Sequence, residues 1–271
     1  MRKDKKMKKI ISVFLAVMML ALSVCGLSSC NPNPEDTLVC GVTIVEGLNE
    51  QLPDGSWTGF DTEFATEVAK LLDMKVKFVE INWEQKYNEV NSGAIDAIWN
   101  GFTANSADNG VPRSELVDFS YGYMLNQQCI VVKTDKLAEF TSVDSLKGKT
   151  ATAEKGSAGE AFAADIEGAT VTPVPTQLGT FMEVKSGAVE FAVVDILLAK
   201  NICGTGDYAN LSIVESIQLE SEVYAVGFKK GSELTEKVNA AMKQLEENGK
   251  LQELAIKYGF ENVVGIVEEI E

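Results

Sequence analysis

The chain has 271 residues, with 24 Lys and Arg against 40 Asp and Glu, and its formal net charge at pH 7 is −16. This acidity argues against binding to nucleic acid and against electrostatic adhesion to anionic lipid. The sequence contains no histidine, which removes the usual general base and the commonest metal ligand and weakens any hydrolase or metalloenzyme interpretation. We therefore expect no metal, no cofactor and no nucleic-acid partner.

The first thirty residues have the pattern of an export signal. Basic residues are concentrated in residues 2–9, residues 10–22 are apolar, and Leu27-Ser28-Ser29-Cys30 is similar to a bacterial lipobox. The apolar stretch is short against the roughly 20 residues that a membrane-spanning helix needs. We predict a lipoprotein signal peptide over residues 1–29, lipid on Cys30, and a polar tether over residues 30–36. The protein would then be extracytoplasmic and anchored to the cell membrane by this lipid.

Three cysteines would remain after export and lipidation, namely Cys40, Cys129 and Cys203. Their number is odd and no C-x-x-C spacing occurs, so a disulfide framework is not expected. Cys40 and Cys129 lie in apolar segments, where a thiol usually serves as a small buried hydrophobic group.

Residues 37–271 alternate between strand-like and helix-like segments, which is typical of an α/β fold. Asp61 stands before a segment with apolar residues at helical spacing and is predicted to be its N-cap. The other elements expected in the first part are strands at residues 38–45, 76–80 and 96–99, a turn at 53–55 and a helix at 84–91.

The second part of the chain continues the alternation. We predict strands at residues 126–133, 150–153, 171–174, 190–194 and 221–228, and helices at 142–147, 156–166, 178–186 and, as a pair, 234–258. The strands at 126–133 and 221–228 are read as two crossings between two α/β lobes with a ligand cleft between them. We assign residues 37–126 and 227–271 to lobe 1 and residues 127–226 to lobe 2.

The most informative segment is residues 93–128. It reads G-A-I-D-A-I-W-N-G-F-T, then Arg113, then V-D-F-S-Y-G-Y-M-L-N-Q-Q. A short apolar strand here breaks into small polar residues at its carboxyl end, the edge at which open α/β sheets bind ligands. The segment resembles the extracellular solute-binding proteins, family 3, of polar amino-acid ABC importers. The order of elements matches that family over nearly the whole of residues 37–271, which implies the two-lobed periplasmic-binding-protein fold of type II.

The resemblance implies a site for the α-carboxylate of a free amino acid. Arg113 keeps the family's spacing to Phe119-Ser120, and Gly156-Ser157-Ala158 matches a segment whose backbone N–H groups bind anions at a helix N-terminus. Ala158 replaces a hydroxyl residue of the family pattern, and Ser157 as a plain N-cap is the alternative role. The interval from Thr103 to Arg113 is five residues longer than usual, so an inserted loop at residues 104–112 decides whether Arg113 stays in the site.

The resemblance also implies a site for the α-ammonium group. Asp195 would be its counter-ion, and the carbonyl of Gly101 and the hydroxyl of Thr103 would complete the set. On local sequence alone Asp195 is better explained as the N-cap of the following helix.

Side-chain specificity is less well determined. Asn100, Gln177 and Glu46 are the further candidate ligand-binding residues, and Trp99 is expected to point into the core. These groups favour a polar amino acid, and neutral and basic ligands both remain open.

The predicted function is capture of an extracellular polar amino acid by a monomeric binding protein, and its delivery to an ABC permease with its ATPase. No Walker-type phosphate loop occurs, so ATP hydrolysis would belong to another chain. One alternative is a cleft enzyme on the same fold, a dehydratase acting on prephenate or arogenate, with Glu46 or Glu160 as general acid. The other is an amino-acid-sensing subunit.

Overall fold

The computed structural model describes residues 36–270, and its residues from Thr37 onward form one compact unit. The predicted signal peptide, the lipidation of Cys30 and all of the tether except Asp36 lie outside the described residues. Within the described range no helix combines the length and the apolar composition that crossing a bilayer requires.

The described unit is built on one path of hydrogen-bonded strands in the order β10-β9-β11-β8-β13-β5-β1-β4, with β12 and β14 also paired to β8. The strands of this path and its side branches are β1 Thr37–Val42, β4 Lys75–Glu80, β5 Ala97–Ile98, β8 Asp118–Lys133, β9 Thr150–Thr152, β10 Thr170–Val171, β11 Phe191–Asp195, β12 Leu211–Ile213, β13 Ser221–Phe228 and β14 Val264–Val267. Two small hairpins complete the strands: β2 Glu50–Gln51 with β3 Trp57–Thr58, and β6 Ala107–Asp108 with β7 Val111–Pro112.

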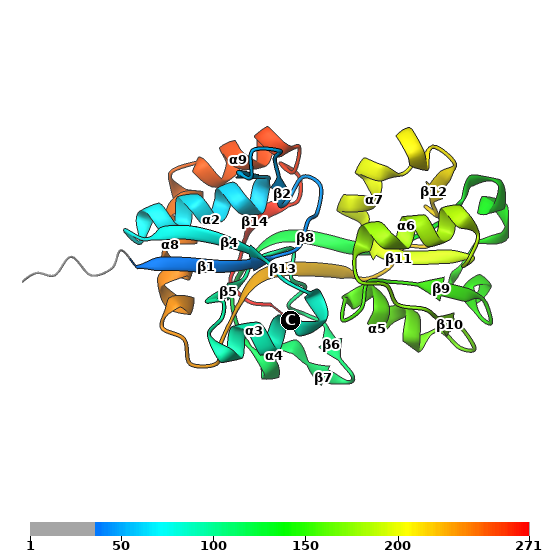
Figure 1. Ribbon diagram of the computed structural model, residues 1–271, viewed down its shortest axis with the longest axis horizontal. Coiled ribbons are helices and arrows are strands. Elements are labelled where there is room, and N and C mark those ends of the chain that lie inside the picture. Colours follow the sequence, from blue (N-terminus) through cyan, green and yellow to red (C-terminus); the bar gives the residue numbers. More distant parts are fainter. Residues whose placement is uncertain (1–35, 271) are drawn as a thin grey trace, which may run out of the picture. The chain divides into compact units, whose positions relative to one another are not determined.

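Helices cover the strands in two groups (Figure 1). They are α2 Phe60–Leu71, α3 Lys86–Ser92, α4 Arg113–Leu116, α5 Ala158–Asp165, α6 Gln177–Ser186, α7 Ile196–Ile202, α8 Leu234–Glu247 and α9 Lys250–Tyr258. Short 3-10 helices lie at Trp83–Gln85, Thr134–Glu139, Val143–Leu146 and Gly206–Tyr208. In Figure 1, α2, α3, α4, α8 and α9 lie with β1, β4 and β5, whereas α5, α6 and α7 lie with β9 to β12.

The two groups are the two lobes, and β8 and β13 run from one to the other. Residues 118–127 of β8 pair antiparallel with β13, and residues 128–132 pair antiparallel with β11. The parallel pairs of β1 with β4 and β5 in one lobe, and of β9 with β10 and β11 in the other, confirm the predicted two-lobed α/β fold. The residue limits assigned to each lobe stay a prediction.

One buried apolar cluster extends from lobe 1 into lobe 2, and smaller ones lie within single lobes. Helix α2 turns Phe60, Phe64, Ala65 and Val68 toward β1 and β4, at the spacing of one helical face. In lobe 2, Ile130, Ala151, Phe191 and Val193 form a second buried cluster between the strands and α5. Cys40 and Cys129 are buried and carry free thiols, as the apolar context predicted.

Two details of lobe 1 differ from the sequence-based expectation. Gly59, with φ 112°, is the N-cap of α2, so the assignment of Asp61 as N-cap was wrong. A Cβ on Gly59 would meet the carbonyl oxygen of Leu48 at 2.2 Å, so only glycine fits where the chain enters this helix. The inserted loop at residues 104–112 contains the hairpin β6–β7. This hairpin was not predicted, because its residues show no apolar pattern.

Candidate functional site

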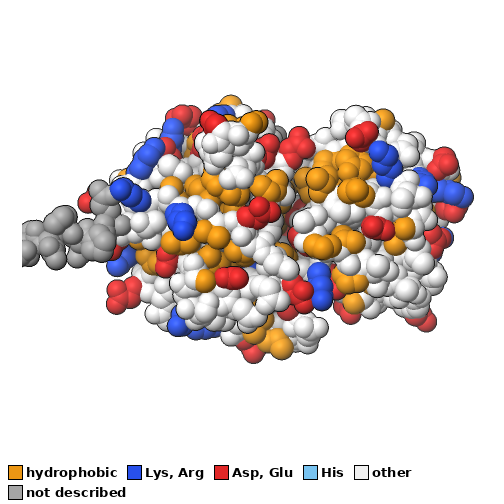
Figure 2. Space-filling model, viewed as in Figure 1, with side chains coloured by type: hydrophobic (Ala, Val, Ile, Leu, Met, Phe, Trp, Pro, Cys, Tyr) orange, Lys and Arg blue, Asp and Glu red, His pale blue; other side chains and the backbone are white. Residues whose placement is uncertain are grey.

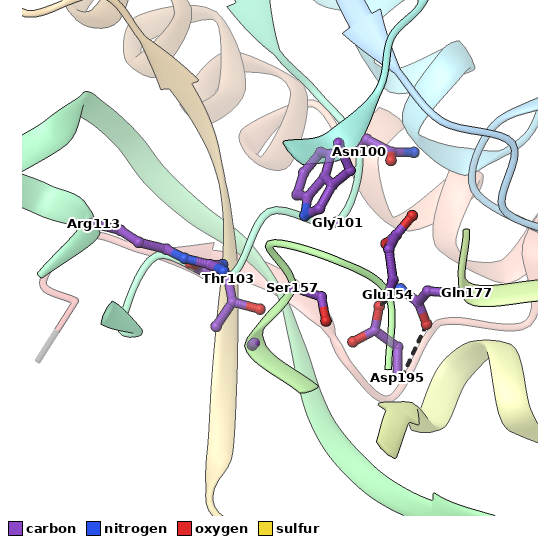
Figure 3. A pocket seen from close by; sticks show the side chains of 10 residues that line it. Asn100, Gly101, Thr103, Arg113, Glu154, Ser157, Gln177 and Asp195 are labelled. Carbon is purple, nitrogen blue, oxygen red and sulfur yellow. Dashed lines mark hydrogen bonds between the residues drawn. The ribbon is translucent and has the colours of Figure 1, made fainter. Parts of the chain in front are cut away.

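A small polar cavity lies between the lobes (Figure 3). Its volume is about 20 Å³ for the centre of a water-sized sphere, while a single water needs about 10–15 Å³. Lobe 1 contributes Trp83, Asn100, Gly101, Thr103 and Arg113, and lobe 2 contributes Glu154, Ser157, Ala158, Gln177 and Asp195. This space is smaller than an amino acid.

Eight of the nine ligand-binding candidates predicted from sequence line this cavity, and Glu46 does not. Glu46 is exposed on the loop after β1, so the structure gives no support to its pairing with a ligand in the cavity. Trp99 is fully buried in the core of lobe 1, as the strand alternation predicted.

The loop after β5 is held in place by side chains from other elements. The N–H of Gly101 donates to Asp61 Oδ2 at 2.9 Å, and Tyr123 OH donates to the same oxygen at 2.9 Å. Asn100 accepts from Thr43 Oγ1 at 2.5 Å and donates to the carbonyl of Thr43 at 3.0 Å. These bonds fix the backbone that presents Gly101 and Thr103 to the cavity.

Arg113 lines the cavity but its guanidinium already has partners. Asp108 Oδ1, from the inserted hairpin, accepts from Nε at 3.0 Å and from Nη2 at 2.9 Å. The carbonyls of Thr103 and Gly156 accept from Nη1 at 3.1 Å and Nη2 at 3.2 Å. These four bonds leave one of the five arginine donors, on Nη1, for a ligand.

Lys86 is a second buried cation beside Arg113, and sequence reasoning did not identify it. Its side chain is 1% exposed, and Nζ donates to the carbonyl of Gly156 at 2.8 Å and lies 3.4 Å from Asp108 Oδ2. Burial and the neighbouring Arg113 charge lower the pKa of Lys86 to about 8. Burial opposes ionisation of Asp108, but the charges of Arg113 and Lys86 prevail and hold the pKa of Asp108 below its usual value.

The N-terminus of α5 forms part of the lobe 2 wall. Ser157 Oγ accepts from the N–H of Glu160 at 3.1 Å, so Ser157 is the N-cap of α5, and it lines the cavity as well. The alternative role proposed for Ser157 is thus confirmed and is compatible with ligand contact. Glu160 Oε2 accepts from the N–H of Gly156 at 2.6 Å.

Asp195 ends β11, stands at the N-cap position of α7 and makes no side-chain capping bond. Its Oδ1 instead accepts from Asn126 Nδ2 at 3.0 Å and from Gln128 Nε2 at 2.5 Å, and its Oδ2 accepts from Gln177 Nε2 (Figure 3). All three donors are neutral amides, and burial raises the pKa of Asp195. The prediction of a plain N-cap from local sequence was therefore wrong.

Two more carboxyl groups lie beside Asp195, and sequence reasoning missed both. Glu154 follows β9, lines the cavity and is 3% exposed. Glu222 in β13 accepts from the same Asn126 and Gln128 amides, at 2.7 and 3.0 Å. Burial, helped by the Asp195 charge, raises the pKa of Glu154 to about 8 and that of Glu222 to about 7. Glu154 could not be identified from the sequence, because no sequence pattern distinguishes a glutamate that follows a strand in this way from an ordinary surface glutamate.

Contacts between the lobes close the cavity on one side. The carbonyl of Gly156 in lobe 2 accepts from both Lys86 and Arg113 of lobe 1, and Lys155 pairs with Glu84 at 2.8 Å. The inserted hairpin packs against α5 at the same side. Figure 2 shows the visible face indented between the two lobes, with charged side chains of both signs scattered over it.

Comparison with known proteins adds independent information. The family model of the bacterial extracellular solute-binding proteins, family 3, matches residues 47–262. The chain is 27% identical to the arginine-binding extracellular protein ArtP of Bacillus subtilis, over 93% of this chain and 98% of that protein. It is 28% identical to the L-cystine-binding protein TcyA of the same organism, over 94% and 98%. A solved structure of an ancestral amino-acid-binding protein, a precursor of cyclohexadienyl dehydratase, is similar with a TM-score of 0.72 and 26% identity, covering 82% of this chain and 95% of that one.

Proposed function

Because the chain belongs to the bacterial extracellular solute-binding proteins of family 3, we propose that it binds a free polar amino acid in the inter-lobe cavity and delivers it to the permease of an ABC importer. The proposal includes anchoring outside the cytoplasm through lipid on Cys30. Relatives that match almost the whole chain are an arginine-binding and a cystine-binding protein, which supports an amino acid as the ligand without choosing one.

The observation that carries the proposal is that groups of opposite charge line one largely buried cavity. Arg113 and the N-terminus of α5 offer N–H donors on one part of the wall, and Asp195 offers a carboxylate on another (Figure 3). A zwitterionic head group needs both, because leaving either charge buried and unpaired costs several kcal/mol. The α-carboxylate would take the free Nη1 donor of Arg113 and the backbone N–H group of Ala158, because the N–H of Ser157 already donates to the carbonyl of Glu154 at 3.1 Å. The α-ammonium would lie between Asp195, the carbonyl of Gly101 and Thr103.

Ligand binding would be coupled to lobe movement about β8 and β13. Separation of the lobes breaks the bonds from Lys86 and Arg113 to Gly156 and the Lys155–Glu84 pair. A ligand that contacts both walls would restore the closed arrangement, which is the hinge closure common in such two-lobed folds.

We favour binding over catalysis. Of the two general acids considered from sequence, Glu46 is exposed and Glu160 is bonded to the N–H of Gly156. The cavity also holds more carboxylates than cations, which disfavours a dicarboxylic acid such as prephenate.

The test is a thermal-shift screen of the purified protein against the common amino acids, with prephenate and simple dicarboxylates as controls. A ligand of the folded state stabilises it by about 2.7 kcal/mol at a hundredfold excess over Kd. We expect a shift in melting temperature with one or a few amino acids only.

Asp195→Ala should weaken binding of that amino acid by about 2–4 kcal/mol, because it leaves the ligand's ammonium group unpaired. A shift with prephenate alone, or undiminished affinity in the Asp195 variant, would contradict the proposal.

A further inference from the structure

The cavity and its immediate surroundings contain more negative than positive groups. The carboxylates are Asp195 and Glu154 on the wall, Glu222 behind Asp195, and Asp108 on the inserted hairpin. The cations are Arg113 and Lys86. Four carboxylates against two cations leave a formal charge of −2 when all are ionised.

The two cations are engaged with the fourth carboxylate. Asp108 Oδ1 contacts two nitrogens of Arg113, and its Oδ2 lies 3.4 Å from Lys86 Nζ and accepts from Tyr87 OH at 2.6 Å. Within the described part of the chain no Lys or Arg nitrogen lies within 4.0 Å of a carboxylate oxygen of Glu154, Asp195 or Glu222. Asp108 thus neutralises one of the two cations and leaves a single positive charge on the lobe 1 side. The charges of Lys86 and Arg113 act on Glu154 and Glu222 only from beyond ion-pair distance, and there they favour the ionised carboxyls without overcoming burial.

The donors around Asp195 and Glu222 are neutral amides. Asn126 and Gln128 each direct an NH₂ group to both carboxylates. Asn126 Oδ1 has no hydrogen-bond partner in the described structure, although this side chain is 5% exposed. Buried carboxylates are normally paired with a cation, so this wall has the composition of a binding site for positive charge that comes from outside the chain.

The net charge of the ligand decides how much of the surplus negative charge around the cavity is neutralised. A neutral amino acid is a zwitterion, so in its presence the surplus of two negative charges is removed only if two of the carboxyls keep protons. A ligand with a further cationic group lowers it, and a ligand with two cationic groups and no carboxylate cancels it. Each uncompensated charge is strongly unfavourable where it is buried.

We propose that the ligand of this cavity carries two positively charged nitrogen groups, one bound at Asp195 and the other at Glu154. This inference rests on the proposed function in placing one ammonium at Asp195, and it narrows the ligand to an organic dication. Two sources share that chemistry: an amino acid with a cationic side chain, and a diamine or guanidino-amine without a carboxylate. Because Arg113 has one free donor, the second source is compatible with the geometry.

The pKa values of the wall agree with this assignment. Burial keeps the pKa of Glu154 at about 8 and that of Glu222 at about 7, so both carboxyls hold protons near neutral pH until a cation displaces them. Uptake of the dication is then accompanied by proton release, which calorimetry in buffers of different ionisation enthalpy measures directly.

The experiment compares matched ligands by calorimetry on the same protein. Arginine and citrulline have nearly the same shape and differ in the side-chain charge, whereas agmatine keeps both cationic groups of arginine and lacks the carboxylate. Lysine, norleucine and cadaverine form a second set, and glutamine is a further neutral control. We expect at least one dication to bind about 100-fold more tightly than its neutral counterpart, with proton release.

The two sources are separated within the same data. Tight binding of arginine or lysine with weak binding of the amines supports this inference and the proposed function together. The reverse preference supports this inference and overturns the amino acid as ligand. Equal or tighter binding of citrulline, norleucine or glutamine overturns the dication while leaving the proposed function standing. No binding by any of these compounds or the common amino acids overturns both.

A variant tests the assigned residue. Glu154→Gln keeps the shape of the side chain and should weaken dication binding about 30-fold or more. Glu167→Gln, on an exposed side chain of the same lobe, is the matched control and should change nothing. Unchanged dication affinity and unchanged proton release in Glu154→Gln would remove Glu154 from the site.

Discussion

At the scale of single residues, the buried acids of this protein organise the site rather than the ends of helices. Asp61 and Asp195 both stand where a helix begins, and neither caps it with its side chain. Asp61 is fully buried and uses one oxygen to accept from Gly101 and Tyr123, while its Oδ1 has no partner. Burial raises the pKa of Asp61 to about 7. Asp61 is therefore a positioning residue for the loop that borders the cavity.

Substitution of Asp61 separates this role from capping. In Asp61→Ala the N–H of Gly101 and the hydroxyl of Tyr123 lose their acceptor, and each buried unsatisfied group costs about 1–3 kcal/mol. We expect a lower melting temperature together with weaker ligand binding, measured by calorimetry. Asp61→Asn keeps an acceptor in place and should retain affinity. If the alanine variant lost stability but bound normally, Asp61 would matter to the helix and not to the site.

At the scale of elements, the inserted hairpin β6–β7 is the part of this chain that most changes the expected chemistry. A longer interval before Arg113 raised the question of whether the arginine is displaced. The side chain remains on the cavity wall, but the hairpin supplies Asp108, which holds two of its nitrogens. The insertion therefore leaves Arg113 on the cavity wall and occupies two of its five N–H donors.

Asp108→Asn tests what the hairpin contributes. The change removes one negative charge next to two buried cations, so the free energy of unfolding should fall by about 3 kcal/mol, the scale for breaking a buried pair. The cavity also becomes less negative, so affinity should fall for cationic ligands and rise for neutral amino acids. Chemical denaturation and calorimetry measure the two effects.

A matched control lies on the same side of the cleft. Lys155→Gln breaks an exposed ion pair with Glu84, in which the side chains are 51% and 40% exposed, and exposed pairs contribute about 0–1 kcal/mol. Equal effects of the Asp108 and Lys155 substitutions on stability and on ligand preference would show that the hairpin pair has no special role.

At the scale of the whole molecule, the sequence predicted the architecture well and the electrostatics poorly. The predicted bounds of β13 match the observed ones at both ends, because the spacing of apolar residues in a strand follows which side chains are buried. Glu154, Glu222 and Lys86 could not be identified, because they are far apart in the chain and are charged residues of kinds that usually face solvent. The link that Asn126 makes between two carboxylates depends on the pairing of β8 with β13, which the sequence pattern does not reveal.

The same buried carboxyls make the stability of the whole molecule depend on pH. The folded-state pKa values of Glu154, Glu222 and Asp61 are raised to about 8, 7 and 7 by burial. In the unfolded chain they return to about 4. Between these values the folded state binds more protons than the unfolded state, so the stability that protonation provides is present below about pH 4 and is lost as pH rises toward 8.

We therefore expect the unliganded protein to lose stability from about pH 5 to pH 8, by up to about 1.4 kcal/mol per pH unit for each carboxyl that titrates. Lys86 acts in the opposite direction only above pH 8, because its pKa is lowered to about 8. Chemical denaturation at half-unit pH intervals measures how steeply stability falls with pH. Glu154→Gln removes one titrating carboxyl and should make this decline shallower by the contribution of that group.

A cationic ligand favours the ionised carboxyls, so in its presence the decline in stability should flatten and the affinity for the ligand should rise over the same pH interval. A pH-independent stability of the unliganded protein in this range would mean that the three carboxyls are ionised, and hence better solvated or better paired, than their burial implies.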